Sequence, residues 1–329
     1  MKEIRIKDGD SNQRIDKFIK KYLNEAPLSF IYKTFRKKDV KVNDHWVEQS
    51  YILKKGDVIK IYVSDEKLKE FNTPKKIEDI KVSLDVIYED ENILIVNKDK
   101  GLLTHGDISE KRITLANQVL KYLYSKNEFD PKTANYIPSP VHRLDRNTSG
   151  LVIFAKKLTI SQVLLDLLKE KIDIEKYYLT LVYGEAKESD EIDAPLIKNE
   201  ELGLVKVDFK NKFAKNALTR YRLIDTRNNY SLLEVNLITG RTHQIRVHLA
   251  YRSLPLLGDA KYGNFNANKE FEKLYKYTGQ FLHAYKIKFL EIKNENLKYL
   301  SNKTFVAPLP SREEKIVNML NINLKKLKI

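Results

Sequence analysis

The hydrophobic pattern divides the chain into two parts that a charged stretch separates. In the first part, residues 12–64, apolar side chains recur at helical spacing over 15–23 and again near 30–36. Strand-like runs follow at 40–44 and at 58–63, each next to turn residues. The pattern predicts a small α/β module at the N-terminus.

Residues 65–81 contain many charged side chains and no sustained apolar periodicity. Such a composition is typical of a solvated linker. We therefore expect three units, an N-terminal domain over 1–64, a linker over 65–81 and a larger domain over 82–329.

The larger part mixes strands with irregularly placed helices. The pattern predicts strands at 84–88, 93–96, 151–155, 177–183, 217–224 and 231–238, and helices after Thr114, over 158–169, after Thr242 and within 312–329. Strands and helices do not alternate strictly, and the last two strands read as a hairpin. We expect an α+β fold whose larger domain has a mixed, mainly antiparallel sheet.

Composition narrows the choice of partner. The chain has 329 residues, with 60 Lys and Arg against 45 Asp and Glu, a formal net charge of +15. This excess favours a polyanion, nucleic acid first and an anionic membrane second. The chain has no cysteine, which excludes disulfides and thiolate metal sites. Without an apolar signal segment or an 18-residue apolar run, we expect a soluble cytoplasmic protein that does not bind membranes.

Candidate chemistry concentrates in residues 142–150, His-Arg-Leu-Asp-Arg-Asn-Thr-Ser-Gly. Arg143 and Arg146 flank Asp145, and an apolar strand follows the turn. A carboxylate on a loop before a buried strand, with guanidinium groups beside it, suits an ionised nucleophile next to a phosphate-bearing substrate. The alternative is an ordinary polar turn with a surface ion pair, which contributes little to stability.

Two other segments carry polar side chains in unusual density. Residues 176–184 read as a strand with tyrosines, which is also typical of a plain core strand. Residues 239–249 follow a glycine turn, and we expect Thr242 to cap the helix that begins there. His243 and His248 are five residues apart, a spacing that does not place both imidazoles on one helix face, so we expect no metal site.

These segments, in this order, resemble the active-site motifs of the RluA-type pseudouridine synthases. The resemblance extends to Asn97-Lys98-x-x-Gly101-Leu102-Leu103-x-His105, Gly258-Asp259-x-Lys261-Tyr262-Gly263 and Leu282-His283-Ala284. Residues 12–63 resemble the S-four RNA-binding module at the N-terminus of the RluC and RluD branches. Two positions depart from the family pattern: Asp99 replaces a usual proline, and Phe30 a usual arginine.

The resemblance implies isomerisation of uridine to pseudouridine within RNA, without a cofactor. Asp145 is the implied catalytic carboxylate, acting on the sugar as the glycosidic bond breaks; attack on the anomeric carbon and removal of a sugar proton both remain open. Arg246 is implied to pair with Asp145, which we expect to be bidentate. Tyr178 is implied to stack on the uracil and is a candidate for removing the carbon-bound proton.

Further residues are expected to bind RNA. The target base must flip out of folded RNA, and Arg143 is placed to fill the gap or to hold a phosphate. His142 and Lys98 are expected to contact the substrate. On the N-terminal module, the candidates for phosphate contacts are Arg14, Lys17, Arg36 and Lys37.

The sequence as a whole predicts a monomeric synthase that modifies large-subunit ribosomal RNA. Transfer RNA is an alternative substrate. A noncatalytic RNA-binding ribosome-assembly factor is an alternative of a different class, although such a protein has no use for a desolvated acid. A glycoside hydrolase would need a second carboxylate as its acid, and the motifs supply only Asp145.

Overall fold

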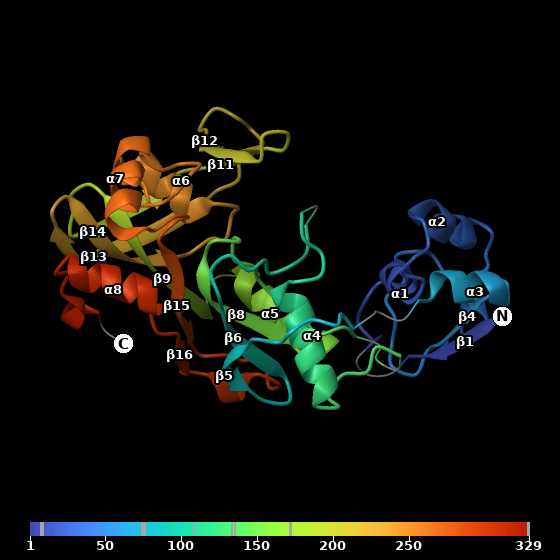
Figure 1. Ribbon diagram of the computed structural model, residues 1–329. Helices are drawn as coiled ribbons and strands as arrows, with labels where there is room; N and C mark the ends of the chain where they lie inside the picture. The colour runs from blue at the N-terminus through green and yellow to red at the C-terminus, as the bar shows by residue number, and fades with distance from the viewer. Residues whose placement is uncertain are drawn as a thin grey trace.

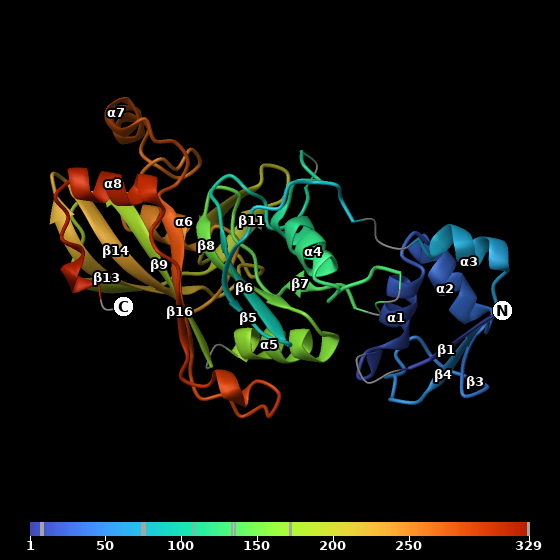
Figure 2. The same cartoon turned by 60° about the horizontal axis from the view of Figure 1, so that its bottom comes forward.

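The computed structural model describes residues 1–6, 10–73, 77–107, 109–132, 134, 136–170 and 173–327. The first seventy or so residues form a body that stands to one side of the rest of the chain (Figures 1 and 2). The remaining residues build a large curved sheet with helices on both faces.

The N-terminal body is a four-stranded antiparallel sheet, in the order β1-β4-β2-β3, packed against helices. Its elements are β1 (Lys2–Arg5), α1 (Ile15–Tyr22), α2 (Leu28–Arg36), β2 (Val40–Val42), β3 (His45–Trp46), β4 (Val58–Ile61) and α3 (Asp65–Phe71). The buried hydrophobic side chains of this body run from Ile6 to Leu68 and form a cluster of their own. The buried residues of the large sheet belong to other clusters.

Helix α3 corrects the expectation that the linker begins at residue 65. Ser64 caps this helix by accepting a hydrogen bond from the Lys67 amide, and Leu68 is buried in the N-terminal core. The ring of Phe71 packs on Phe30, with centroids 4.8 Å apart. The two apolar residues occupy less than one turn, which is too short to show as periodicity in the sequence.

The larger sheet has the order β10-β13-β14-β9-β15-β8-β6-β5, with β16 paired to β15 and β7 to β8. Its strands are β5 (Asp85–Glu89), β6 (Ile93–Lys98), β7 (Ser139–Pro140), β8 (Ser149–Ala155), β9 (Ile174–Tyr183), β10 (Ser189–Asp193), β13 (Leu218–Arg227), β14 (Tyr230–Leu237), β15 (Leu282–Phe289) and β16 (Thr304–Val306). Strands β11 (Leu196–Asn199) and β12 (Leu204–Val207) form a separate hairpin that projects from the body (Figure 1). This architecture confirms the expected α+β class with a mainly antiparallel sheet.

Helices cover both faces of the large sheet. They are α4 (Leu115–Ser125), α5 (Leu158–Glu170), α6 (Gln244–Tyr251), α7 (Phe265–Tyr275) and α8 (Ser311–Met319). Successive residues of β6 alternate between two cores: Leu94 and Val96 pack with α4, whereas Ile93 and Ile95 pack with α5. Across the described ranges, no helix combines the length and the apolar character needed to cross a membrane.

The sequence located the β13–β14 hairpin but overestimated its loop. The strands continue to Arg227 and from Tyr230, so only Asn228 and Asn229 form the turn. Both have left-handed backbone, φ 50° and 63°, a conformation that asparagine tolerates better than most residues. The expected helix cap is confirmed at Thr114, which accepts a hydrogen bond from the Asn117 amide at 3.1 Å.

The two halves of the large sheet join where β8 pairs with β15. This pairing is parallel, whereas the other pairings between labelled strands of the described chain are antiparallel. Ser149 lies beside His283, and its hydroxyl is 2.9 Å from Nδ1 of that imidazole. Burial lowers the pKa of His283 to about 4, so the ring is neutral and fits the seam without a charge.

Gly150 lets the two strands approach at this junction. Its φ is +113°, and a Cβ there would lie 2.3 Å from the Ala284 carbonyl oxygen. Replacement by alanine must move the backbone of β15, so we expect Gly150→Ala to lower the free energy of unfolding by at least about 3 kcal/mol. Urea denaturation measures this change.

Gly101→Ala is the matched control. Gly101 also has a positive φ, +87°, but no atom lies within 4 Å of the added Cβ. This variant carries the backbone strain without the clash, and we expect a loss of about 1 kcal/mol. Equal losses in the two variants would show that the close approach at Gly150 is not what stabilises the junction.

Candidate active site

Asp145 lies on the loop that connects β7 to β8. A turn closes directly after it, in which the Thr148 amide donates a hydrogen bond to the Asp145 carbonyl oxygen at 3.0 Å. The strand β8 that follows is buried along its whole length. The carboxylate is therefore attached to a fixed backbone while its own side chain keeps 29% exposure.

The segment 98–104 holds this loop from behind. Thr104 bonds to both backbone groups of Leu144, at 3.1 and 3.2 Å, and the Gly101 amide donates to the Arg146 carbonyl at 2.8 Å. The Lys98 ammonium donates to the carbonyls of Asp99, Leu102 and Arg146, at 2.9, 2.7 and 3.1 Å. These bonds fix the chain on both sides of Asp145.

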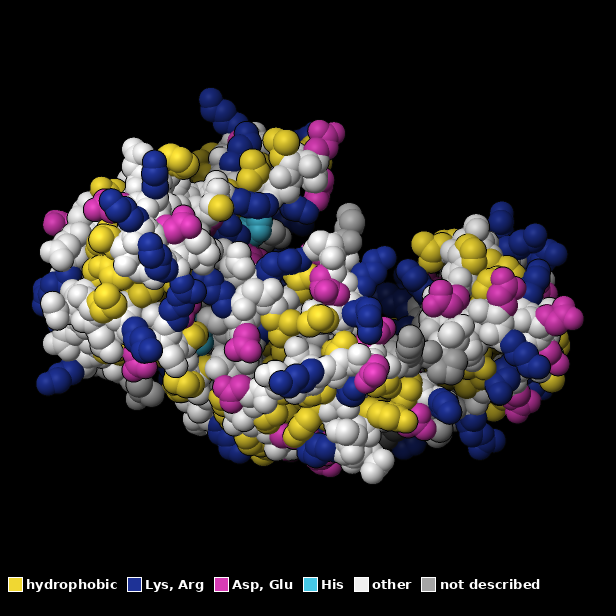
Figure 3. Space-filling view, in the orientation of Figure 1, with side chains coloured by type: hydrophobic (Ala, Val, Ile, Leu, Met, Phe, Trp, Pro, Cys, Tyr) yellow, Lys and Arg dark blue, Asp and Glu magenta, His cyan; other side chains and the backbone are white. Residues whose placement is uncertain are grey.

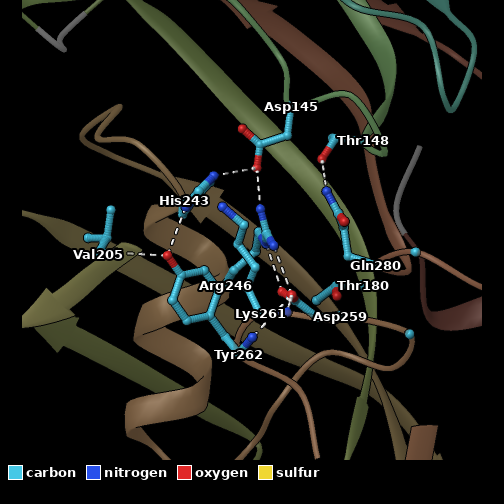
Figure 4. Close-up of polar contacts among 12 residues, drawn as sticks. Asp145, Thr148, Thr180, Val205, His243, Arg246, Asp259, Lys261, Tyr262 and Gln280 are labelled. Atoms are coloured by element: carbon cyan, nitrogen blue, oxygen red, sulfur yellow. Dashed lines mark hydrogen bonds and ion pairs between the residues drawn. The ribbon is translucent and has the colours of Figure 1, made fainter. Parts of the chain in front are cut away.

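Arg246 links Asp145 to a second carboxylate (Figure 4). Its Nε and Nη2 donate to the two oxygens of Asp259, at 2.7 and 2.8 Å. Its Nη1 donates to Oδ2 of Asp145 at 2.8 Å. The expected bidentate pair between Arg246 and Asp145 is therefore wrong: the bidentate partner is Asp259, and Asp145 receives a single bond.

This arrangement is electrostatically stable although it is buried. The side chain of Asp259 is 0% exposed and that of Arg246 only 7%. Burial opposes the charged form of each, but their mutual hydrogen bonds outweigh it, so the pKa of Asp259 lies below its ordinary value and that of Arg246 above. The amides of Lys261 and Tyr262 also donate to Asp259, at 2.9 and 3.2 Å. The guanidinium is thus locked before any substrate arrives.

His243 approaches Asp145 from the other side. The amide of Val205 donates to the Tyr262 hydroxyl oxygen at 2.8 Å, and that hydroxyl lies 2.8 Å from Nδ1 of His243. The hydroxyl hydrogen is therefore free to bond Nδ1, which leaves the proton of a neutral imidazole on Nε2. Nε2 is 3.9 Å from Oδ2 of Asp145, and Figure 4 shows the ring directed toward that carboxylate.

The orientation of His243 comes from an unusual helix start. Helix α6 begins at Gln244, and His243 before it has left-handed backbone with φ 54° and no side-chain cap. The expected cap by Thr242 is wrong. The tight turn instead aims the imidazole at the pocket, while Gln244 accepts a hydrogen bond from the Arg241 amide at 2.9 Å.

A pocket opens in front of these groups. Its charged or polar walls include Arg143, Arg241 and His243, and its apolar walls are Leu144, Leu237, Ile245 and Leu282. Figure 3 shows Lys and Arg side chains around a hollow below the β11–β12 hairpin, with histidine at its base. The lining can hold a flat base against apolar surface while cations face a phosphate.

Tyr178 on β9 forms the floor of this pocket. The residue is only 5% exposed, and burial, together with the nearby Asp145 carboxylate, raises the pKa of its hydroxyl above the ordinary value. Tyr178 therefore remains a neutral phenol at physiological pH. A neutral phenol of this kind is a poor general base.

The structure brings together four of the expected site residues, Arg143, Asp145, Tyr178 and Arg246, in one pocket. Lys98 is 1% exposed with its ammonium directed at backbone carbonyls, so the expected substrate contact is replaced by support of the loop. His142 also faces inward. It accepts a hydrogen bond from the Ile153 amide at 3.2 Å, and burial lowers its pKa to about 3, so it cannot offer RNA a positive charge.

The expected phosphate-binding residues of the N-terminal module, Arg14, Lys17, Arg36 and Lys37, are all exposed and lie on that module, outside the pocket. Arg14 forms a bidentate pair with Asp16, at 3.1 and 2.9 Å. Phe30, which stands where an arginine was expected, packs on Phe71 of α3.

Within the described ranges, no group of histidine and acidic side chains is arranged to hold a metal ion. His248 is 0% exposed and bonds Thr219 and the Ala194 carbonyl, each at 2.9 Å. Its role is structural.

Sequence reasoning assigned no role to Asp259 or Tyr262, although it noted their motif. The sequence signal was the glycine directly before the aspartate, Gly258-Asp259. The structure shows why a glycine stands there: Gly258 has φ +75°, and a Cβ would lie 2.4 Å from the Gly279 carbonyl oxygen. A glycine required by close packing, next to a buried aspartate, indicates a tight turn that holds the aspartate in a fixed position. Only the fold shows that this turn lies beneath Arg246.

We expect the two carboxylates that bind Arg246 to differ in their effect on stability. Asp259→Asn leaves a buried guanidinium without its bidentate partner and should cost about 3–5 kcal/mol of unfolding free energy. Asp145→Asn leaves Asp259 in place and removes one bond from a partly exposed side chain, so it should cost about 1 kcal/mol or less. Urea denaturation of both variants at one pH provides the comparison, and the reverse order would contradict the assignment of Asp259 as the primary partner.

Lys98 should give the fold a measurable pH dependence. Burial lowers its pKa from 10.5 to about 7, so between these values the unfolded chain binds a proton that the folded chain lacks. Unfolding free energy therefore rises with pH across this window because of Lys98, with a slope of at most about 1.4 kcal/mol per pH unit.

Lys98→Met isolates this contribution. We expect the difference in unfolding free energy, wild type minus Lys98→Met, to increase between pH 7 and pH 10 and to be constant below pH 6. A flat difference over the whole range would mean that the ammonium is not desolvated in the folded protein.

Comparisons with known proteins identify the family of the chain. A family model described as RNA pseudouridylate synthase matches residues 92–251. An uncharacterized RNA pseudouridine synthase of Mycoplasma capricolum is 37% identical over 309 residues, covering 92% of this chain and 95% of that protein. Ribosomal large subunit pseudouridine synthase C of Vibrio parahaemolyticus is 34% identical over 322 residues, covering 95% of this chain and 94% of that protein.

Among solved structures, that of human RNA pseudouridylate synthase domain containing 4 has a TM-score of 0.59 at 21% identity, covering 73% of this chain and 94% of that one. A likeness at this identity shows a common fold. The sequence relatives show the family as well, because their identity to this chain exceeds 30% over nearly the whole length of both proteins. The chain therefore belongs to the RluA-type RNA pseudouridine synthases, isomerases that act on RNA.

Proposed function

We propose that this enzyme converts uridines of large-subunit ribosomal RNA to pseudouridine, with Asp145 as its catalytic nucleophile. The observation that carries the proposal is the partly exposed carboxylate of Asp145, which is bonded once to Arg246 at 2.8 Å and lines the same pocket as Tyr178. A single bond from the guanidinium leaves the second carboxylate oxygen available to the substrate.

The chemistry follows from charge. Cleavage of the bond between the anomeric carbon and the ring nitrogen builds positive charge on the sugar, which an ionised carboxylate captures. The uracil leaves with the electron pair as the Asp145 carboxylate bonds to the anomeric carbon. After the uracil has turned within the pocket, one of its ring carbons attacks the anomeric carbon and displaces the carboxylate. That ring carbon then loses its proton, and the ring nitrogen that was bonded to the sugar gains one. Atoms and electrons balance without an oxidant or a cofactor.

Of the two roles considered for Tyr178, stacking on the uracil and removal of the carbon-bound proton, we assign it stacking. Its ring forms an apolar face on which the uracil can lie during rotation. Since burial and Asp145 raise the pKa of the hydroxyl, a phenolate is disfavoured, and removal of the carbon-bound proton by Tyr178 is the weaker assignment.

The choice of ribosomal RNA rests on the relatives. Several proteins of 31–35% identity carry the name ribosomal large subunit pseudouridine synthase C, for example those of Vibrio parahaemolyticus, Vibrio vulnificus and Pasteurella multocida. In this proposal the N-terminal body, which extends through α3 to Phe71, is an S-four-like domain that binds RNA, and residues 82–329 form the catalytic domain. Arg143 is exposed, and no side chain of the described chain pairs with it, so its guanidinium can enter the space that a flipped base leaves.

Asp145→Asn provides the direct test. We expect pseudouridine formation in a large-subunit RNA transcript to fall by at least about 10³-fold, because the amide cannot capture the sugar cation. Affinity for the transcript should stay within about threefold of the wild type. Nucleoside mass spectrometry measures the product, and a filter-binding titration measures affinity.

The same assay separates the alternatives. Free uracil as product would indicate a hydrolase, and binding without any product would indicate a noncatalytic RNA-binding factor. Modification of transfer RNA in preference to ribosomal RNA would overturn the substrate assignment but leave Asp145 in place. Turnover of Asp145→Asn near the wild-type rate would remove the proposed nucleophile.

A further inference from the structure

Trp46 is the only tryptophan of the chain, and it lies on the surface of the N-terminal module. It ends β3, the edge strand of the small sheet, and is 45% exposed. Its indole N–H donates to the Phe35 carbonyl at 3.4 Å, and the Lys38 ammonium lies 5.4 Å from the ring centroid. The ring is thus held in one place without being part of the core.

The indole borders a hollow of about 380 Å³ between the end of α2 and the residues after β3. Arg14 and Arg36 reach this hollow from two sides, and Glu48 and Gln49 line it as well. Arg14 is already paired with Asp16, whereas no carboxylate of the described residues pairs with Arg36. Arg36 and Lys38 therefore place two positive charges beside the indole, and the exposed Glu48 is the acidic residue that lines the hollow.

These features match the two parts of a nucleotide. A base stacks on an exposed aromatic ring, and a guanidinium binds the phosphate beside it. Bases within a duplex are already stacked on their neighbours on both sides, so they have no free face to place on the Trp46 ring. The complementary ligand is therefore an unpaired nucleotide of a single-stranded segment.

We propose that Trp46 and Arg36 form a second RNA-binding site, on the N-terminal module, that captures an unpaired nucleotide outside the catalytic pocket. The site deepens the proposed function, since it rests on RNA as the substrate. Any base would serve, because every base has a stacking face. The site would position the RNA and take no part in the reaction.

A single tryptophan makes the site directly observable. We expect a twelve-nucleotide oligoadenylate, which contains no uridine, to quench the tryptophan fluorescence of the full-length protein in a saturable titration. Inorganic polyphosphate of equal charge should not quench it, because it has no base to stack. An RNA duplex of the same length should also leave the fluorescence unchanged.

Variants separate stacking from charge. By fluorescence anisotropy of labelled oligoadenylate, Trp46→Ala should weaken binding about tenfold, and Trp46→Phe, which keeps a ring, by no more than about threefold. Arg36→Gln should weaken binding several-fold and lower the slope of log affinity against log salt by about 0.7, the value for one phosphate on a single strand. Phe265→Ala, which removes an aromatic side chain of 79% exposure from the catalytic domain, should leave affinity unchanged.

Kinetics with a ribosomal transcript distinguish a failure of the Trp46 site from a failure of the proposed catalytic function. With a ribosomal transcript, Trp46→Ala should raise KM and leave kcat unchanged. Normal pseudouridine formation together with unquenched fluorescence, or an equal loss of affinity in Trp46→Ala and Phe265→Ala, would overturn the second site while the catalytic assignment stands. Quenching by polyphosphate equal to that by oligoadenylate would also overturn it, since charge alone would then explain the signal.

Discussion

The buried pair of Arg246 and Asp259 is the interaction on which the site depends. Two parallel hydrogen bonds fix the plane of the guanidinium, and the amides of Lys261 and Tyr262 fix the carboxylate. Burying both charges costs free energy of desolvation. The pair in return holds the guanidinium of Arg246 in one orientation. Nη1 of Arg246 consequently meets Oδ2 of Asp145 in a defined place, 2.8 Å away, and this single bond leaves the other oxygen of Asp145 to offer to a substrate.

The surrounding fold serves this geometry from several distant parts of the chain. The segment 98–104 supports the Asp145 loop from behind, β15 meets β8 just after that loop, and the turn at Gly258 brings Asp259 beneath α6. The β11–β12 hairpin also reaches the site, because the Val205 amide bonds the hydroxyl that holds His243. Two hydrogen bonds thus connect the hairpin to His243, whose Nε2 lies 3.9 Å from Oδ2 of Asp145.

Sequence alone could predict the elements with strong periodicity and the residues within strong motifs. Asp145, Arg246 and Tyr178 do lie together, and the helices and strands that carry them were expected. Pairings that depend on three-dimensional placement were not readable. Nothing in the sequence distinguishes a lysine that faces RNA from Lys98, which is buried under three carbonyls, and helix periodicity cannot show that Arg246 has two acidic partners. Short elements such as α3 lack the length to produce a pattern.

The central claim is that Asp259 contributes to catalysis only by holding Arg246. A double-mutant cycle of single-turnover rates of pseudouridine formation, with Asp259→Asn, Arg246→Lys and the double variant, measures this most directly. We predict strong coupling, with the double variant no slower than the slower single variant. Either change alone already removes the fixed guanidinium that bonds Asp145, so the second change has nothing further to remove. Losses that multiply independently would show that Asp259 acts apart from Arg246 and would contradict the account.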